Sequence, residues 1–550
     1  MRPPSAMAPY FGLRGSSLRR AIVYLVVCPA FITYGYNLSV TGGLLTLESF
    51  VETFPQLDTL NTKGAEQHHN STMQGTVVAL FTIGGIFGSL SCIYLGDLLG
   101  RRRVILIASA VTIIGALLMT TSFDLPQLIV ARVILGLGTG AYLATVPVWQ
   151  AEISKASKRG ANVVTDGIFI GAGVALGLWV DFGFFFVKGS SVSWRFPLGF
   201  QIVPLLMALV FILFFPESPR WLVKKGRVEE ARQILAALDD LDPGSESIKQ
   251  EIRDIELSLS QCGTLSWKAM LSMGEQRLFH RTVLAATGQI FQQMCGINLI
   301  SMYATTIFEQ YLGLSPRTFA VAVRHPVVEG HAINGRAAAI PPNSPGRHGT
   351  NFPANVRHQL DLHPLGGFLA YFTIDRLGRR VLMLWSAAGM SVCMAVLAGT
   401  TSSVGNQTAL VVAVIALYFF QFIYTVGYSG LTFLYATEVA PLQLRAAISA
   451  VSTAAVWTFN FLLAEITPVG FNTIGYRYYI IFAILNAAIV PSVYFFFPET
   501  NGRSLEEIDG IFQESKSIWD PPRIARNLPK MSTAQPVDIS VHSEGNKDLL

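Results

Sequence analysis

The chain has 550 residues, of which 51% are hydrophobic and 14% are charged, and its mean hydropathy is +0.45. Soluble domains carry roughly 25% charged residues, so this composition excludes an ordinary soluble protein and predicts an integral protein of the lipid bilayer. The net charge of +5 comes with no basic patch interleaved with aromatic residues, so no nucleic-acid partner is expected.

Twelve apolar segments follow one another along the chain. They cover residues 21–40, 77–94, 104–121, 128–149, 167–186, 200–215, 283–300, 366–374, 381–397, 410–428, 446–466 and 479–497. Most approach the ~20 residues that a helix needs to cross the hydrocarbon core, and 366–374 has about half of that length. We therefore predict an all-α membrane protein with twelve transmembrane helices in two pseudo-symmetric six-helix bundles, the eighth helix being disrupted.

Polar segments divide the chain into five parts. We expect an N-terminal tail (1–20), an N-terminal bundle (21–220), a helical linker (221–281), a C-terminal bundle (282–500) and a tail (501–550) that is largely disordered after 518. Lys and Arg gather in short connections on one side, which predicts that these loops, the linker and both termini are cytoplasmic. The sequons at Asn70 and Asn406 then fall outside, where N-glycosylation can occur.

Three short charged motifs occur twice in the same order. The paired acids are Asp97 and Asp375, Glu152 and Glu438, and Glu217 and Glu499, which lie 278, 286 and 282 positions apart. This offset holds along most of the chain, so one half duplicates the other. Duplication with such a long period in an apolar chain is typical of a transporter with a substrate site between two similar bundles.

The duplicated charges lie at the predicted cytoplasmic ends of helices, where acids and arginines can pair while that side is closed. The candidate residues of this cytoplasmic latch are Asp97, Arg101, Arg102, Glu152, Arg159, Asp375, Arg379, Arg380, Glu438 and Arg445. Opening must break such pairs, which gives the two-state element that alternating access requires. The alternative is that the arginines only fix topology and contact headgroups, but topology does not need the acids.

Amide side chains concentrate in segment 283–300. Gln289, Gln292, Gln293 and Asn298 are offset by 0, 3, 4 and 9 positions, so they share roughly one side of a helix. Amides both donate and accept hydrogen bonds, as a neutral polyhydroxylated ligand requires. The alternative is that these amides form hydrogen bonds between helices, and the residues alone do not favour either interpretation.

Several motifs together resemble the sugar porter family of the major facilitator superfamily, and most of all fungal hexose transporters. They are Gly35-Tyr36, the motifs at Asp97 and Asp375, and residues 132–138, 216–221, 292–298 and 498–509. The resemblance covers about residues 20–515. It implies the major facilitator fold, a monosaccharide substrate, no cofactor or metal, and a multi-pass protein of the plasma membrane.

The resemblance also implies a substrate site. It assigns sugar binding to Gln289, Gln292, Gln293, Asn298, Trp457 and Asn460, with Phe433 and Tyr435 as further candidates. Phe433 stands where many relatives carry Trp. Gly167, beside Asp166, stands where relatives often carry Gln, a departure that weakens any claim that the substrate is glucose itself.

Energy coupling depends on residue 37. Proton-coupled sugar porters carry Asp after the Gly-Tyr pair, whereas this chain has Asn37, and an amide cannot titrate. Facilitative transport is therefore favoured. Glu465, also in an apolar segment, is interpreted as a solvated residue near the outer surface. A symporter using another acid and a non-transporting sugar sensor remain open, whereas no catalytic cluster points to an enzyme.

Residues 318–364 do not fit the pattern. Prolines, glycines and histidines there rule out a membrane helix, and five arginines would fall on the outside. We interpret the segment as a retained intron or a frame error, which would leave the literal chain inactive. The alternative is an extended outer loop followed by an irregular eighth helix.

Overall fold

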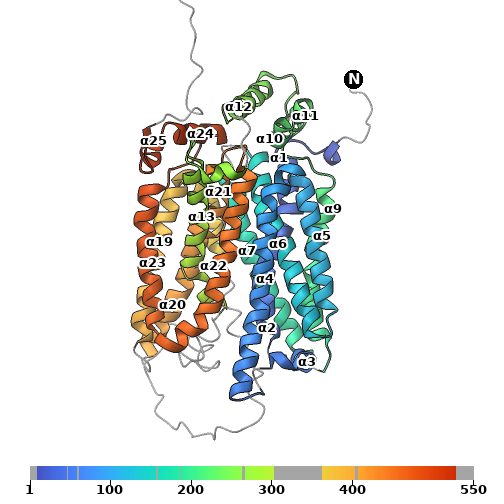
Figure 1. Cartoon of the computed structure of the whole chain (residues 1–550), viewed down its shortest axis with the longest axis vertical. Coiled ribbons are helices and arrows are strands. Elements are labelled where there is room, and N and C mark those ends of the chain that lie inside the picture. The colour runs from blue at the N-terminus through green and yellow to red at the C-terminus, as the bar shows by residue number, and fades with distance from the viewer. Residues whose placement is uncertain are drawn as a thin grey trace, which may run out of the picture.

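The structure is a computed structural model, and it describes residues 9–45, 47–58, 61–155, 159–187, 189–262, 267–302, 362–402 and 407–527. Helices make up its regular structure, and no strand occurs in these ranges. The prediction of an all-α protein is thereby confirmed. Two groups of long helices stand side by side, and short helices cover one end of both (Figure 1). We call this end the linker end.

The N-terminal half contains six membrane-crossing units. They are α1 (Gly15–Ile22) continued by η2 (Val23–Val27) and α2 (Cys28–Leu44), α4 (Ala65–Leu98), α5 (Arg101–Thr120), α6 (Leu125–Ile153), α7 (Arg159–Phe185), and α8 (Val192–Phe200) with α9 (Ile202–Ile212). The short helices η1 (Pro9–Gly12), α3 (Glu48–Thr53) and η3 (Pro55–Leu57) accompany them. Helix α1 begins inside the region expected to be a tail, because Leu18 and Ile22 are buried and Arg19 pairs with Asp239 at 2.7 Å.

The C-terminal half repeats the arrangement. It contains α13 (Leu278–Met294), α14 (Ile297–Met302), α18 (Leu362–Leu377), α19 (Arg379–Thr401), α20 (Gln407–Tyr424), η7 (Thr425–Ser429), α21 (Leu431–Val439), α22 (Arg445–Ile474) and α23 (Arg477–Phe496). Ten helices of the described residues are long and apolar enough to cross a membrane. The shorter α13 and α18, with 17 and 16 residues, occupy the seventh and eighth positions.

The last residues of the anomalous segment, 362–364, form the start of α18. Residues 318–361 of the segment lie outside the described residues, and α18 begins at Leu362. This helix is longer than the apolar segment 366–374, yet its 16 residues rise only about 24 Å, short of the ~30 Å hydrocarbon core.

Linker and tail helices cover the linker end. They are α10 (Pro219–Lys224), α11 (Val228–Asp239), α12 (Glu246–Cys262), η5 (Trp267–Leu271), α24 (Leu505–Gln513) and α25 (Pro521–Asn527). Asp509 of α24 accepts from Ser258 of α12 at 3.2 Å and pairs with Arg281 of α13. Linker, tail and C-terminal half are thus joined, and α25 forms a helix in the region expected to be disordered.

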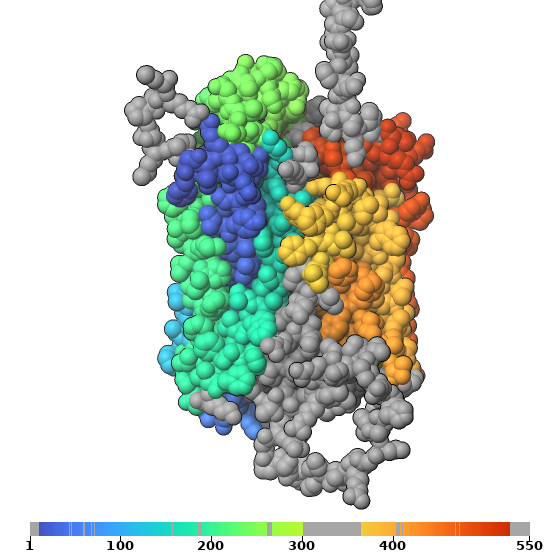
Figure 2. Space-filling view, turned by 180° about the vertical axis from the view of Figure 1, so that it is seen from behind, coloured from blue at the N-terminus to red at the C-terminus, as the bar shows by residue number. Residues whose placement is uncertain are grey.

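The two halves meet along α4 with α22 and along α7 with α18 and α21. From behind, the blue-to-green N-terminal half lies beside the yellow-to-orange C-terminal half (Figure 2). Within the N-terminal half, the backbones of α4 and α6 approach closely where glycines face each other, since a Cβ on Gly140 would lie 2.1 Å from Gly85 O. The Trp457 ring of α22 packs on Gly85, whose added Cβ would meet it at 2.5 Å.

Asn70 does not suit a glycan. It lies within α4, is 4% exposed, and its Nδ2 donates to Asp58 O at 2.8 Å. A glycan needs a free and accessible amide, so the expectation of glycosylation at Asn70 is wrong for this structure. Asn406 lies outside the described residues.

Candidate functional site

Amides of α13 and α14 form a continuous hydrogen-bonded chain. Asn298 Nδ2 donates to Gln293 Oε1 at 2.6 Å, and Gln293 Nε2 donates to Gln292 Oε1 at 3.1 Å. Gln292 Nε2 donates in turn to Tyr428 O and Ser429 O, both at 2.9 Å. These carbonyls belong to η7, a π-helical turn, a form that often marks functional sites.

A break in the seventh helix places Asn298. Helix α13 ends at Met294, and α14 starts at Ile297 after Gly296, whose φ of +100° suits glycine. The Cβ-free residue lets Met394 and Phe482 pack against the turn, since a Cβ there would lie 2.6 Å from Met394 Cε. Asn298 consequently sits on a separate short helix and still reaches Gln293.

Three buried polar atoms on α13 and on α22, which packs against it, have no hydrogen-bond partner among the described protein atoms. They are Gln289 Nε2, Trp457 Nε1 and Asn460 Oδ1, and their residues are at most 1% exposed. Gln289 uses its other atom, Oε1, to accept from Thr432 at 3.1 Å. Buried polar atoms are nearly always satisfied, so two donors and one acceptor of this kind point to a ligand or water.

Aromatic residues join the halves beside these atoms. Trp457 packs edge-on against Tyr34 and Phe81, with ring centroids 5.6 and 5.3 Å apart, and Phe433 packs against Phe31 at 6.2 Å. The sequence did not single out Phe31, Tyr34 or Phe81, because isolated aromatic residues in apolar helices carry no distinguishing pattern. These rings provide flat apolar faces of the kind that cover the non-polar side of a sugar ring.

Tyr435 is engaged inside the C-terminal half. Its ring stacks on Phe497 at 5.1 Å, and its hydroxyl donates to Pro498 O at 3.2 Å. The described contacts of Tyr435 are therefore packing contacts within its own half, and none of them is made with Gln289, Trp457 or Asn460.

Asn37 is held within the N-terminal half. Its Nδ2 donates to Thr33 O at 3.0 Å and to Gln201 Oε1 at 2.8 Å, which ties α2 to the break between α8 and α9. Glu465, the other residue considered for coupling, is exposed on α22.

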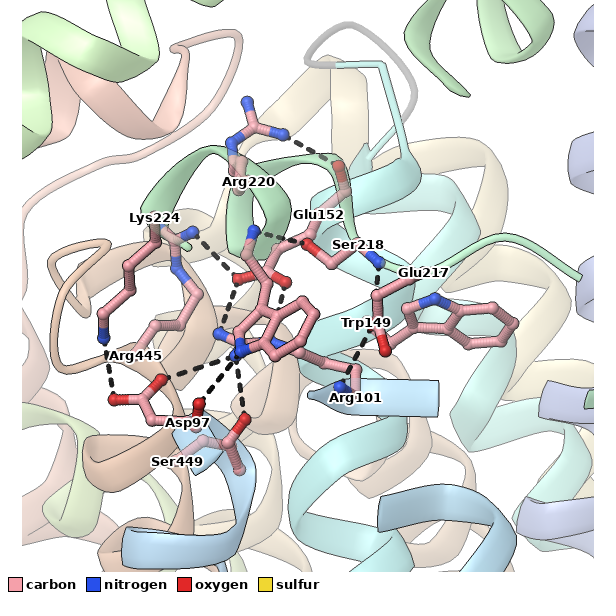
Figure 3. Close-up of polar contacts among 12 residues, drawn as sticks. Asp97, Arg101, Trp149, Glu152, Glu217, Ser218, Arg220, Lys224, Arg445 and Ser449 are labelled. Carbon is pink, nitrogen blue, oxygen red and sulfur yellow. Dashed lines mark hydrogen bonds and ion pairs between the residues drawn. The ribbon is translucent and has the colours of Figure 1, made fainter. Parts of the chain in front are cut away.

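At the linker end of the N-terminal half, Glu152 accepts from two buried arginines (Figure 3). Arg101 binds it through two parallel contacts of 3.0 and 3.1 Å, and Arg101 also pairs with Asp97 at 3.5 Å. Arg445 of the C-terminal half reaches Glu152 at 3.4 Å. The Glu152 carboxylate thus pairs with Arg101 inside its own half and with Arg445 of the other half.

The C-terminal half repeats the intra-half pair. Glu438 accepts from Arg379 at 3.0 and 3.2 Å and from Thr500 at 2.7 Å, and Arg379 also pairs with Asp375 at 3.1 Å. Arg379 and Glu438 are 1% exposed. Arg102 and Arg380, by contrast, are half-buried and donate to the carbonyls of Leu213 and Tyr494.

Further contacts cross between the halves at the linker end. Asp375 accepts from the backbone N–H of Ala161 at 3.0 Å, in the first turn of α7. Lys224 bridges Asp97 and Gln443 O, both at 2.7 Å. Arg159 donates to Arg503 O at 3.4 Å. The structure therefore brings most of the predicted latch residues together at the linker end, leaves Arg102 and Arg380 outside the acid–arginine pairs, and adds Lys224, which the sequence did not single out.

A buried glutamate caps α5 in the connection that follows α9. Glu217 accepts from the backbone N–H groups of Arg101 and Arg102 at 3.1 Å, and Glu499 does the same for Arg379 and Arg380 at 2.9 and 3.1 Å. Burial raises the pKa of Glu217 although these N–H groups and Arg101 oppose the shift. Burial likewise lowers the pKa of Lys224, against the effect of Asp97.

Comparison with known proteins adds a family and a fold. The family model described as "Sugar (and other) transporter" matches residues 23–328 and 365–512, leaving out 329–364. Sugar transporter STL1 of Saccharomyces cerevisiae is 33% identical over 98% of this chain and 89% of its own length. Low-affinity glucose transporter HXT1 of the same yeast is 28% identical over 94% and 85%.

Solved structures agree on the fold. The proton:xylose symporter XylE of the major facilitator superfamily, bound to 6-bromo-6-deoxy-D-glucose, gives a TM-score of 0.73 at 22% identity, covering 90% of this chain and all of that one. The predicted major facilitator architecture is therefore confirmed at the level of the fold.

Proposed function

Because the chain belongs to the sugar transporter family of the major facilitator superfamily, we propose that it carries a hexose-like monosaccharide by alternating access through the site between its halves. It is a multi-pass membrane transporter and not an enzyme. The observation that carries the proposal is the set of buried, unpartnered atoms on Gln289, Trp457 and Asn460.

A sugar would complete this set. Its hydroxyl oxygens can accept from Gln289 Nε2 and Trp457 Nε1, and a hydroxyl proton can be donated to Asn460 Oδ1. The chain from Asn298 to Gln292 holds the neighbouring amides in fixed orientations, which lowers the ordering cost of binding. Ring faces of Trp457 and Phe433 cover the apolar side of the ligand.

We place the linker end in the cytoplasm of a plasma-membrane protein, with both termini on that side. The support is the concentration of Lys and Arg in its short loops. Because contacts of Glu152, Asp375 and Lys224 close that end, we assign the structure to a state in which the cytoplasmic exit is shut. Release of sugar inward then requires these contacts to break.

Two modes of coupling fit this site. Facilitative transport follows from Asn37, which carries no titratable group. Symport requires another buried acid, and Asp166 of α7 provides one, as argued in the next subsection. A sensor without turnover finds no supporting observation in the site.

Uptake of labelled sugars tests the proposal. Cells lacking their own sugar carriers, expressing the form of this protein that lacks most of residues 318–364, are expected to take up D-glucose, D-xylose or another monosaccharide of a panel, and unlabelled substrate should compete. Counterflow in proteoliposomes isolates the carrier activity from any driving force. Failure to exchange every sugar of the panel would overturn the proposal.

Gln293→Ala and Asn298→Ala are each expected to weaken sugar binding roughly two- to tenfold, because each removes hydrogen bonds worth about 0.5–1.5 kcal/mol. Binding to purified protein measures the effect. Gln127→Ala is the matched control, since this amide donates to Leu118 O in the N-terminal half, far from α13. Equal affinity in all four proteins would remove the amide chain from the site.

Gly160→Ala is expected to favour the state that is open at the linker end. A Cβ at this position would lie 2.1 Å from Asp375 Oδ1 and 2.6 Å from Arg379 Nη2, so these side chains must shift, which weakens the contact of Asp375 with Ala161 across the halves. Labelling of a cysteine introduced at Ser449, whose Oγ contacts Ala144 O across the halves at 3.0 Å, should accelerate. Gly183→Ala on the same helix, with nothing within 4 Å of its added Cβ, should leave labelling unchanged.

A further inference from the structure

Asp166 is a buried carboxylate that the site as described does not use. It lies in α7, about two turns from Arg159, and its relative exposure is 0%. Neither carboxylate oxygen has a hydrogen-bond partner among the described atoms, and no described residue forms an ion pair with it. We propose that Asp166 binds the proton that accompanies each sugar, which makes this protein a proton symporter. The inference rests on the proposed sugar transport.

Two described groups act on Asp166. Cys28 of α2 lies within its electrostatic reach, and the Gln150 amide of α6 lies close by. Gln150 Nε2 donates one hydrogen to Asn162 O at 2.6 Å, and its second hydrogen acts on the Asp166 carboxylate without the geometry of a full hydrogen bond. The carboxylate therefore faces a thiol and an amide, and no cation of the described residues balances it.

Most of the other titratable and charged side chains that the structure describes on the elements packed against α7 make contacts elsewhere. They are Tyr34, Tyr36, Arg132, Glu152, Arg195, Asp375, Tyr428, Tyr435 and Glu438. Tyr142 lies more than two turns from Gln150 along α6, and Tyr371 and Arg376 of α18 are exposed. None of these groups offers Asp166 a counter-charge.

An unpaired carboxylate inside a membrane protein is costly in its charged form, and such groups are functional candidates by default. A bound proton removes that cost. In the state closed at the linker end, Asp166 is accordingly loaded with a proton. Release needs a state in which water or a cation reaches the same carboxylate.

Relative motion of the two halves can bring water or a cation to the Asp166 carboxylate. The residue after Asp166, Gly167, touches the other half, because a Cβ there would lie 2.9 Å from Gly430 N and 3.1 Å from Ser429 Oγ. Ser429 O accepts from Gln292 of the amide chain. Asp166 and the sugar site thus share one contact between α7 and η7, and opening the linker end separates α7 from η7 and α21.

Asp181 provides a matched control. It lies on the same helix, is 3% exposed, and both its oxygens also lack a partner among the described atoms. Its 15-residue separation from Asp166 corresponds to about 22 Å of helix. Its described electrostatic neighbour is Tyr36 of the same half, so rocking of the halves does not directly change that contact.

Proteoliposomes separate proton movement from sugar movement. With D-glucose or D-xylose as probe, whichever exchanges in counterflow, adding sugar outside wild-type vesicles should draw protons inward and raise the external pH. Asp166→Asn should abolish this alkalinisation and the response of uptake to an imposed pH gradient, while counterflow persists. Asp181→Asn should retain all three activities.

Each other result has a defined meaning. Absence of counterflow in the wild type contradicts the proposed transport itself. Counterflow without proton movement in the wild type, or proton movement that survives in Asp166→Asn or disappears only in Asp181→Asn, overturns the assignment of Asp166. If Asp166→Asn does not fold, Asp166→Glu is the second test. Because glutamate also titrates, this variant should retain symport, with a shift in the pH of half-maximal uptake. An unshifted pH profile would contradict the proposal.

Discussion

Glu152→Ala is expected to abolish nearly all transport and to leave the protein open at the linker end. The substitution leaves Arg101 and Arg445, both at most 1% exposed, without their shared acceptor. Removing one partner of a buried pair costs about 3–5 kcal/mol, because the remaining charge stays buried. Here the loss falls on the closed state, since opening exposes Arg445 to water. The equilibrium therefore shifts toward the open state.

Labelling of Ser449→Cys measures the shift, and two further variants locate its cause. Arg445→Ala removes the cross-half contact while Glu152 stays paired with Arg101, so labelling should rise less than in Glu152→Ala. Glu438→Ala breaks the equivalent pair with Arg379 inside the C-terminal half and should lower thermal stability with little change in labelling. Equal labelling in Glu152→Ala and Glu438→Ala would show that Glu152 has no special role between the halves.

The literal 550-residue chain is expected to give no sugar uptake, because α18 has only 16 residues and the prolines, glycines and histidines before it prevent its extension to the length that the eighth position requires. An eighth span that fails to cross the membrane would invert every helix that follows it. The family model leaves out residues 329–364, most of this segment, and resumes at 365. Sequencing the transcript should reveal a form that lacks most of the segment and encodes ~20 apolar residues ending at Asp375.

Expression of both forms decides the point. The shortened product should reach the plasma membrane and transport, and it is then the form in which the substitutions above are measured. The full-length product should be retained inside the cell, as surface labelling of an epitope tag would show. Robust uptake by the 550-residue chain would mean that the segment is a tolerated outer loop.

Much of the fold could be predicted from the sequence, because membrane helices depend on long apolar segments and the duplicated charges fix the correspondence between the halves. Local pattern could not fix helix ends: α1 starts at Gly15 because the linker supplies Asp239 to Arg19. Likewise, the burial of Asn70 depends on Asp58 O, a contact that a sequon does not encode.

The sequence predicted the amide residues of the site, but it predicted less well which other side chains surround them. Gln289, Gln292 and Gln293 share a helix face, so their clustering follows from spacing alone. Tyr435 is an aromatic residue of the kind that contacts sugars, yet its ring stacks on Phe497 and its hydroxyl donates to Pro498 O. Asp166 was noted only as a neighbour of Gly167, because burial without a partner arises from three-dimensional packing.

The first turn of α7 contains its own reporter of opening. The Ala161 N–H is one of the four that a helix start cannot satisfy internally, and its acceptor, Asp375, belongs to the opposite half. When the halves part, this amide loses its acceptor and becomes free to exchange with solvent deuterium. Its exchange rate, read by mass spectrometry on a peptide from the start of α7, would therefore count openings directly, without a label and in the unsubstituted protein.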